Sequence, residues 1–205
     1  KAGEEEARER SRRENREKGF AHLRDGNTAA ADQCFQRAVD ITPRMAARVI
    51  EALKELGVES IVAPYEADHE MAFLAKTEAV HAVITEDSDM LAYGVERVLF
   101  KMDHAGNGME IRVKDLSLNK ELNFVGFTME HFLEMCILSG CDYLPSIPGI
   151  GVKKAHGYIR RFKTYSKVIR HIRLEGLKVD RTYEARFADA LRTFRHPWVY
   201  CPQQR

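Results

Sequence analysis

The amino-acid sequence predicts an α/β fold in which a short parallel sheet is followed by a largely helical C-terminal part. Two apolar segments, residues 60–64 and 80–85, are separated by the helical pattern EADHEMAFLAK. A strand, a helix and a second strand at this spacing form a βαβ unit with parallel strands. After Thr128 the pattern is helical to the end of the chain, apart from one loop rich in glycine and proline.

The first part of the chain predicts three helices. Residues 4–25 are highly charged with little apolar stripe, which is typical of a helix that bridges parts of a protein or lines a charged ligand. Residues 27–41 carry apolar side chains at helical spacing. The third helix has Thr42 as its N-cap, Pro43 at its first position and Gly57 just after its end, so its bounds are well defined.

Three segments complete the predicted sheet region. Residues 66–76 form the helix between the two apolar strands, and residues 97–113 form two further strands joined by a loop that uses Asn107 and Gly108. In open parallel sheets the ligand site lies beyond the carboxyl ends of the strands. Functional residues are therefore expected directly after residues 64 and 85.

Composition places the chain among intracellular globular proteins. No apolar run approaches the roughly 20 residues that cross a bilayer, and the first eighteen residues lack the apolar core of a signal peptide. We therefore expect no membrane association. The cysteines show no CxxC pair or other paired spacing, which argues against a zinc site and a disulfide framework; they are Cys34, Cys136, Cys141 and Cys201.

Charge is unevenly distributed along the chain. The net charge is +1, but residues 151–205 contain 14 Lys and Arg against 4 Asp and Glu, which leaves −9 for residues 1–150. A basic segment beside an acidic remainder indicates a polyanionic partner held near a carboxylate site. Solvated helix faces would explain single cations, but they explain less easily a segment so poor in acids.

Acidic residues follow both predicted strands. Glu66 and Asp68 come after the first strand, Asp87 and Asp89 after the second, and Asp142 after an apolar helix. Converging carboxylates repel one another, and Mg²⁺ or Mn²⁺ would relieve that repulsion. The alternative is that they are ordinary acids of helix N-termini. Five together favour a two-metal site, for which phosphodiester hydrolysis is the natural chemistry.

A glycine hairpin joins two of the C-terminal helices. Gly149 and Gly151 flank Ile150, and the next helix begins with Lys153 and Lys154 close behind. Exposed N–H groups at a helix start and nearby lysines bind phosphate, so the segment predicts a helix-hairpin-helix contact to the DNA backbone that reads no bases. The alternative is a plain corner between helices.

Four segments resemble the exonuclease 1 family, within the flap endonuclease superfamily of 5′ nucleases. They are APYEADHEMAFL, ITEDSDMLAYG, FKMDHAGNGMEI and MCILSGCDYLPSIPGIGVKKAHGYI. The resemblance runs from residue 1 to about residue 170. It implies a PIN-like α/β nuclease core with a parallel sheet, a helical arch and a helix-hairpin-helix (H2TH) DNA-binding region. Residues 1–135, with the arch helix 1–26, would belong to the core, and residues 136–205 to the helical DNA-binding region.

The resemblance also implies roles for individual residues. Two Mg²⁺ ions, or Mn²⁺, would be bound by the five acids, Glu66, Asp68, Asp87, Asp89 and Asp142. A K⁺ ion would be held near Ser139, Ser146 and Ile150 and would bridge the hairpin to a DNA phosphate. In the arch, Lys1 and Arg8 fit the lysine and arginine that contact the scissile phosphate, because residues seven apart share a helix face. Arg12 lies on the same face and is the alternative to Arg8.

The implied activity is that of a Mg²⁺-dependent 5′ to 3′ double-stranded DNA exonuclease with 5′ flap endonuclease activity. Its place would be the nucleus, in mismatch repair and in resection during recombination, and its substrates double-stranded DNA with 5′ ends, nicks or flaps. The alternatives are a flap endonuclease or junction resolvase of the same superfamily, or a noncatalytic DNA-binding module.

The sequence departs from the family pattern in four respects. The N-terminal half of the family's nuclease domain, with two further metal-binding aspartates, would precede Lys1, so we expect this chain alone to be weak or inactive. The regions through which the family binds mismatch-repair proteins are expected outside this chain as well. His69 replaces a small residue and is expected at the surface or in packing rather than as a ligand. Cys201 stands where the family has an acid.

Overall fold

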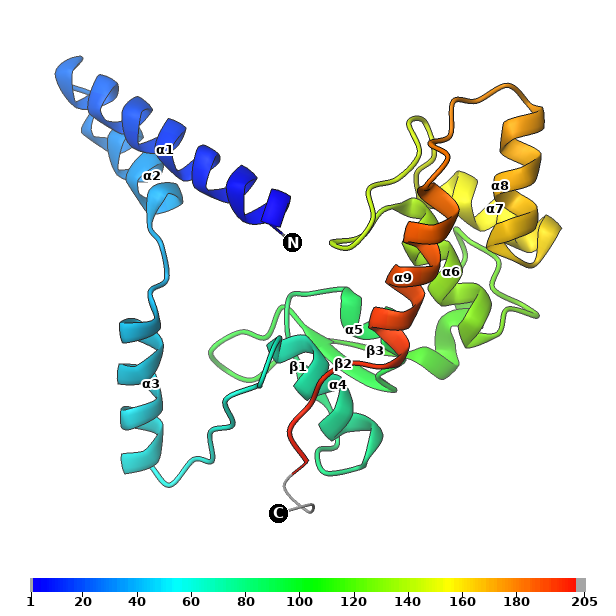
Figure 1. The fold of residues 1–205 in the computed structure, drawn as a ribbon. Helices are drawn as coiled ribbons and strands as arrows, with labels where there is room; N and C mark the ends of the chain where they lie inside the picture. Colours follow the sequence, from blue (N-terminus) through cyan, green and yellow to red (C-terminus); the bar gives the residue numbers. More distant parts are fainter. Residues whose placement is uncertain (1, 202–205) are drawn as a thin grey trace. The chain divides into compact units, whose positions relative to one another are not determined.

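The computed structural model describes residues 2–201 of the chain, and the side chains of residues 6–201 (Figure 1). The chain divides into two compact units, residues 1–61 and residues 62–205, and each is described by itself. Within the described residues, no helix is both long and apolar enough to cross a membrane.

The first unit is built on two helices that pack along each other, α1 (Ala2–Arg24) and α2 (Thr28–Ala38) (Figure 1). The ring of Phe20 meets the ring of Phe35 edge-on, with centroids 5.2 Å apart. A Cβ atom on Gly19 would lie only 2.6 Å from Phe35, so this helical position must be glycine for the two helices to approach. The charged helix predicted from the sequence is therefore present, and a short apolar contact fixes α2 against it.

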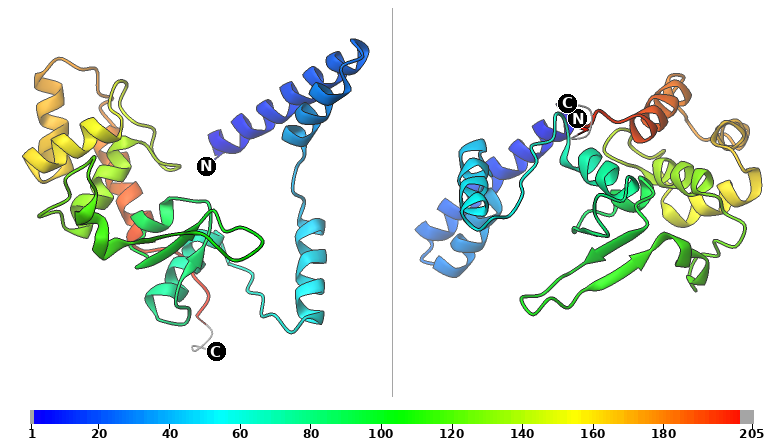
Figure 2. Two further views of the ribbon diagram at one scale, coloured as in Figure 1. Left: turned by 180° about the vertical axis from the view of Figure 1, so that it is seen from behind. Right: turned by 90° about the horizontal axis from the view of Figure 1, so that it is seen from below.

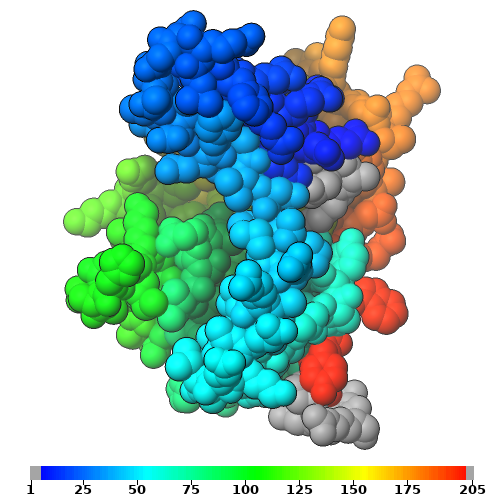
Figure 3. All heavy atoms as spheres, turned by 90° about the vertical axis from the view of Figure 1, so that its left-hand side faces the viewer, coloured from blue at the N-terminus to red at the C-terminus, as the bar shows by residue number. Residues whose placement is uncertain are grey.

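Helix α3 (Pro43–Glu55) begins as its sequence predicts. The N–H of Met45 donates to the hydroxyl of Thr42 at 3.4 Å, and proline occupies the first position. None of its residues is buried, and Val49 of the predicted apolar stripe is 58% exposed. Side chains of α3, coloured from blue to cyan, form part of the surface seen in Figure 3. Capping and propensity thus define a helix whose apolar stripe packs on no buried partner among the described residues.

The second unit contains a small mixed sheet. Its strands are β1 (Val83–Ile84), β2 (Arg97–Phe100) and β3 (Met109–Arg112), in the order β1-β2-β3. Strand β1 is parallel to β2, with Val83 opposite Val98. Strands β2 and β3 are antiparallel and form the predicted hairpin around Asn107 and Gly108, which projects from the sheet in the right-hand view of Figure 2.

The strand predicted at residues 60–64 is not formed, and the one predicted at residues 80–85 is reduced to two residues. The parallel pairing predicted between these two segments occurs instead between β1 and β2. A strand needs a neighbour to bond its backbone groups, and no described segment pairs with residues 60–64. Val62 is accordingly 74% exposed. Apolar composition alone was not enough to specify this strand.

Helices surround the sheet and supply most of the core. Helix α6 (Met129–Ser139) is buried along most of its length and contacts α5, α7 and α9. The predicted cap at Thr128 is confirmed, because its hydroxyl accepts from the N–H of His131 and its own N–H donates to the ring of His131. The other elements of this unit are α4 (Ala67–Lys76), α5 (Asp89–Ala92), the 3₁₀ helix η1 (Val113–Leu118), α7 (Val152–Phe162), α8 (Tyr165–Leu174) and α9 (Tyr183–Arg195).

Candidate active site

Two of the predicted metal ligands lie at the start of α4. Glu66 is the N-cap residue and Asp68 lies in the first turn. The carboxylate of Glu66 makes no capping bond to its own helix. It accepts a hydrogen bond from the hydroxyl of Tyr143, with 2.7 Å between the Tyr143 oxygen and Glu66 Oε2. The side chain is thereby oriented toward the segment after α6 rather than along α4.

Three ring residues form a hydrogen-bonded group around this contact, in which Tyr93 and His69 are buried and Tyr143 is half-buried. The hydroxyl of Tyr93 lies 2.9 Å from that of Tyr143, and His69 Nε2 lies 3.2 Å from the same oxygen. Because Tyr143 gives its single proton to Glu66, its oxygen is left to accept from Tyr93. Burial, the bond to Tyr93 and the charge of Glu66 raise the pKa of Tyr143 far above its usual range. The hydroxyl therefore remains a donor to the carboxylate.

His69 belongs to the packing of this group. It is only 2% exposed, stacks on Tyr65 with centroids 5.8 Å apart and meets Tyr93 edge-on at 5.5 Å. Of the two expectations for this residue, surface or packing, the structure supports packing. Its Nε2 is also 3.6 Å from Glu66 Oε2, so it contributes to the surroundings of a predicted ligand.

Asp87 and Asp89 lie at the start of α5, beyond the end of β1. The N–H of Asp89 donates to Asp87 Oδ1 at 2.9 Å, and the N–H of Asp87 donates to the hydroxyl of Thr85 at 3.0 Å. These bonds fix the turn that leads from the sheet into the helix. Glu86 accepts instead from the N–H of Lys101 at 2.7 Å, which connects the ends of β1 and β2.

Asp142 sits in a tight turn that follows α6. Cys141 and Leu144 exchange backbone hydrogen bonds of 3.0 and 3.1 Å around it. Gly140, just before the turn, has φ of 103°, and an added Cβ would lie 3.2 Å from the backbone nitrogen of Ser146. Glycine is therefore required where α6 ends, because it supplies both the turn and the close approach.

The charges of several predicted acids act on two side chains of the second unit. The charges of Glu66, Asp68 and Asp89 each contribute, after burial, to raising the pKa of Tyr93, and burial with the charges of Asp89 and Asp142 raises that of Cys141. These charges belong to four of the five predicted acids. Their oxygen donors suit a hard cation such as Mg²⁺.

The described residues do not by themselves complete a metal site. Among the side chains of residues 6–201, no group of three or more His, Cys, Asp or Glu is arranged so that it could hold a metal ion. The chemistry of the donors fits a divalent cation, whereas their arrangement leaves the ligand assignment of all five acids a prediction.

The predicted hairpin lies between α6 and α7. The N–H of Ile150 donates to the carbonyl of Ile147 at 2.9 Å, and both side chains are buried, which fixes the loop to the core. Gly149 has φ of 81°, and Gly151 is the N-cap of α7 without a side chain to cover the helix N–H groups. Because Ile150 is only 2% exposed, any contact it makes to an ion or to DNA must use its backbone.

The two predicted lysines lie in the first turn of α7, where both are exposed. The Nζ atom of Lys154 lies 4.0 Å from the position of a Cβ on Gly149, so this side chain reaches back over the hairpin. Free helix N–H groups and an ammonium group thus face the same loop, as a phosphate site requires.

The predicted K⁺ residues lie at the junction of α6 and the hairpin. Ser139 ends α6, and its hydroxyl donates to the carbonyl of Cys136 at 2.7 Å. Ser146 lies close to Gly140, the residue after Ser139. The arrangement brings Ser139 and Ser146 near one another, and their role in binding K⁺ stays a prediction.

The predicted arch residues belong to the first unit. Lys1 lies outside the described residues. Arg8 is an exposed residue of α1, whereas the guanidinium of Arg12 is 3.0 Å from Asp40 Oδ1 and is only 22% exposed. The ion pair connects α1 to the segment after α2. The ion pair gives Arg12 a structural contact within the first unit.

The two tyrosines around Glu66 were not predicted from the sequence. Tyr143 lies directly beside Asp142 in the chain, and Tyr93 is in the segment after Asp89. Only the fold brings these side chains to the α4 N-terminus. A tyrosine adjacent to a predicted ligand is a signal that could have suggested Tyr143, but none pointed to Tyr93.

Comparison with known proteins identifies relatives of this chain. The family model of the XPG I-region matches residues 57–142. The chain is 50% identical to exonuclease 1 of Oryza sativa subsp. japonica, 48% identical to exonuclease 1 of Arabidopsis thaliana and 43% identical to exodeoxyribonuclease 1 of Schizosaccharomyces pombe. These matches cover 98%, 98% and 100% of the chain. The chain spans only 24%, 28% and 36% of the length of these relatives.

Solved structures share the fold. Flap endonuclease-1 from Methanococcus jannaschii matches with a TM-score of 0.62 at 24% identity, over 79% of this chain and 47% of its own. The catalytic core of Rad2 in complex with DNA substrate matches with a TM-score of 0.65 at 21% identity, over 78% and 58%. The junction-resolving enzyme GEN-1 binding potassium matches with a TM-score of 0.61 at 23% identity, over 80% of this chain and 47% of its own. The predicted fold class is thereby confirmed.

Proposed function

Since this chain is a segment of the exonuclease 1 family, within the flap endonuclease superfamily of 5′ nucleases, we propose that its full-length protein is a Mg²⁺-dependent 5′ to 3′ exonuclease with 5′ flap endonuclease activity. Its substrate would be double-stranded DNA with 5′ ends, nicks or flaps. The observation that carries the proposal is 50% identity to an exonuclease 1 across 98% of the chain.

The carboxylates are proposed as the metal ligands, namely Glu66, Asp68, Asp87, Asp89 and Asp142. When bound, Mg²⁺ or Mn²⁺ supplies a Lewis acid and a more acidic water. Tyr143 orients Glu66 through the 2.7 Å bond, and the turn between Cys141 and Leu144 fixes the backbone of Asp142. The protein's own contribution is thus to place carboxylates where the reacting phosphate will lie.

DNA is proposed to be held at the hairpin. The backbone of Gly149, Ile150 and Gly151, with Lys153 and Lys154, would bind a phosphate, and a K⁺ ion at Ser139, Ser146 and Ile150 would bridge to it. Residues 1–135 would then form the catalytic core, and residues 136–205 the DNA-binding region. Lys1 and Arg8 are proposed to contact the scissile phosphate, with Arg12 as the alternative to Arg8.

The setting of this activity is proposed to be DNA repair in the nucleus. Mismatch-repair proteins would bind through regions outside this chain. For the isolated chain, a DNA-binding module without hydrolysis is the second candidate, and the hairpin before α7 with its exposed Lys153 and Lys154 favours it. The chain alone is expected to be weak or inactive.

Substrate comparison tests the proposal. The full-length protein is given a recessed duplex end, a 5′ flap and a four-way junction in Mg²⁺, with EDTA as the control. Release of nucleotides from the recessed end and cutting of the flap are expected, both abolished by EDTA. Cutting confined to the junction would assign the protein to the resolvases, and DNA binding without any cleavage would leave only the binding module.

A further inference from the structure

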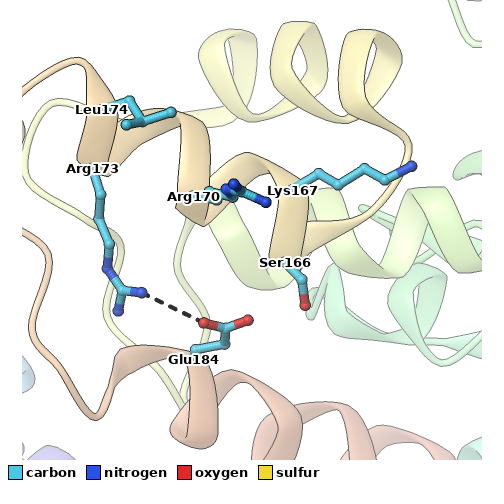
Figure 4. Close-up of a pocket in the computed structure, with 6 residues that line it drawn as sticks. All are labelled: Ser166, Lys167, Arg170, Arg173, Leu174 and Glu184. Atoms are coloured by element: carbon cyan, nitrogen blue, oxygen red, sulfur yellow. Dashed lines mark ion pairs between the residues drawn. The ribbon is translucent and has the colours of Figure 1, made fainter.

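A cationic recess lies between α8 and α9, away from the hairpin residues. Its volume is about 470 Å³, and Figure 4 shows the side chains that line it. Five come from α8 and one from the first turn of α9; they are Ser166, Lys167, Arg170, Arg173, Leu174 and Glu184. Three cations and one acid therefore share this recess.

The fold of α8 explains why these cations are grouped. Val168, Ile169 and Ile172 are fully buried, which directs the remaining side chains of the helix outward. Lys167 and Arg170 are three residues apart and so are neighbours on the helix surface. Like charges at this spacing repel each other. If Lys167 and Arg170 only stabilised the fold, each would be expected to form an ion pair with an acidic side chain.

The one acid that lines the recess is paired with Arg173. Glu184 Oε2 is 3.5 Å from Arg173 Nη1, the contact drawn in Figure 4. Arg173 also donates to the carbonyl of Asp180 at 3.3 Å. In the part of the chain that the structure describes, no carboxylate forms an ion pair with Lys167 or Arg170. Two exposed cations and the Ser166 hydroxyl thus remain to bind an external anion.

We propose that the recess is a second DNA-backbone contact, in which Lys167 and Arg170 bind phosphates of the duplex held at the hairpin. The inference rests on the proposed function, since it deepens the DNA binding assigned above. Guanidinium and ammonium groups suit phosphate, the first as a fork and the second as a point charge.

The position of α8 favours DNA over a small free anion. Helix α7 starts at the hairpin, has 11 residues and contacts α8. Its length is about 16 Å, which is less than half of one turn of duplex at about 34 Å. A duplex bound at the start of α7 is therefore long enough to reach α8 when it runs along α7. The low number of acids in residues 151–205 also matches a surface that faces a polyanion.

The test compares salt dependence of DNA binding by full-length protein. Lys167→Gln and Arg170→Gln are combined, and binding to a blunt duplex is measured by fluorescence anisotropy in EDTA, where metal-dependent cleavage is absent. The control is the combination Lys114→Gln and Lys120→Gln, which removes the same charge from exposed positions elsewhere in the unit. Circular dichroism verifies the fold of both, and Arg170→Lys provides a milder change.

Loss of two phosphate contacts should lower the slope of log affinity against log salt by about 1.8. Between 50 and 200 mM salt, the unmodified protein should consequently lose about 12-fold more affinity than the recess variant. The loss should be equal on unrelated DNA sequences, and combining the recess variant with Lys153→Gln and Lys154→Gln should lower the slope further.

Three results would overturn the inference. A recess variant with the slope and affinity of the unmodified protein would show that α8 does not contact DNA, while leaving the proposed function intact. An equal change in the control variant would show an effect of net charge alone. Failure of the unmodified protein to bind duplex would remove the inference together with the proposed function.

Discussion

Replacing Tyr143 by phenylalanine tests whether the ring residues position Glu66. The change removes one oxygen and preserves the ring. It deletes the 2.7 Å bond to Glu66 Oε2 and leaves the Tyr93 hydroxyl, 2.9 Å away, without the oxygen that accepts its proton. His69 Nε2 loses its 3.2 Å neighbour as well. The perturbation is therefore confined to the polar contacts around one predicted ligand.

The magnitude follows from the kind of bond that is lost. A hydrogen bond to a charged acceptor contributes about 1.5–3 kcal/mol, and an unsatisfied buried hydroxyl adds to the cost. We expect the free energy of unfolding to fall by about 2–3 kcal/mol. Residues that orient metal ligands typically change metal affinity by about 10- to 100-fold, so the Mg²⁺ concentration for half-maximal nucleotide release should rise by a similar factor.

The assay uses full-length protein, with denaturant unfolding for stability and an Mg²⁺ titration of nucleotide release for positioning. Tyr158→Phe is the matched control, because its hydroxyl also donates to a carboxylate, Glu175 Oε2, at 3.1 Å, but lies at the surface. The control should change stability by less than about 1 kcal/mol and leave the Mg²⁺ requirement alone. If the two variants behaved alike in both measurements, the positioning role of Tyr143 would be refuted.

Three further outcomes are expected from other parts of the structure. Gly140→Ala should lower the free energy of unfolding by about 1–3 kcal/mol in thermal denaturation, because φ is 103° there, whereas Gly157→Ala in α7, with open space around it, should not. Burial raises the pKa of Glu134, which accepts from the N–H of Tyr165 at 2.7 Å. The carboxyl group of Glu134 therefore has a higher pKa in the folded protein than in the unfolded chain. Its contribution to the free energy of unfolding is present below the unfolded pKa and is lost as pH rises through the folded pKa. Glu134→Gln should therefore gain stability relative to the unmodified protein as the pH rises above the ordinary range of a glutamate pKa; a difference that stays constant with pH would contradict this. Finally, Lys153→Gln with Lys154→Gln should weaken binding to all DNA sequences alike and lower the salt slope by about 1.8, and an unchanged affinity would exclude the hairpin lysines as phosphate contacts.

Local signals in the sequence predicted the helices well. Thr42, Pro43 and Thr128 mark helix starts because capping depends on a few neighbouring residues, and the glycines near 149 mark the hairpin for the same reason. The segment at residues 60–64 was wrongly predicted as a strand, since pairing depends on a partner that residues 2–201 do not provide. The sequence pattern shows that a segment is apolar, but it does not show which strand the segment would pair with.

The acidic residues of the candidate site were predicted from the sequence, but the side chains that contact them were not. The acids were predicted from their positions after two apolar segments and a helix, although the first of those segments forms no strand. Their convergence on a metal site stays a prediction. The bonds from Tyr143 to Glu66 and Tyr93 span 77 and 50 residues of chain, so no local pattern could indicate them. The ion pair between Arg12 and Asp40 is likewise a tertiary contact that no local pattern indicates.

The measurement that tests the central claim most directly is nucleotide release from a recessed duplex end by full-length protein carrying Asp87→Asn. Asparagine keeps an oxygen to accept from the N–H of Asp89, at 2.9 Å, and removes only the charge. Asp115→Asn, an exposed acid of η1, is the control. We predict a rate lower by on the order of 100-fold or more with duplex binding retained, because a metal ligand is lost and the DNA contacts are not. An unchanged rate, or a loss no larger than that of Asp115→Asn, would contradict the assignment of these carboxylates to a metal-dependent nuclease.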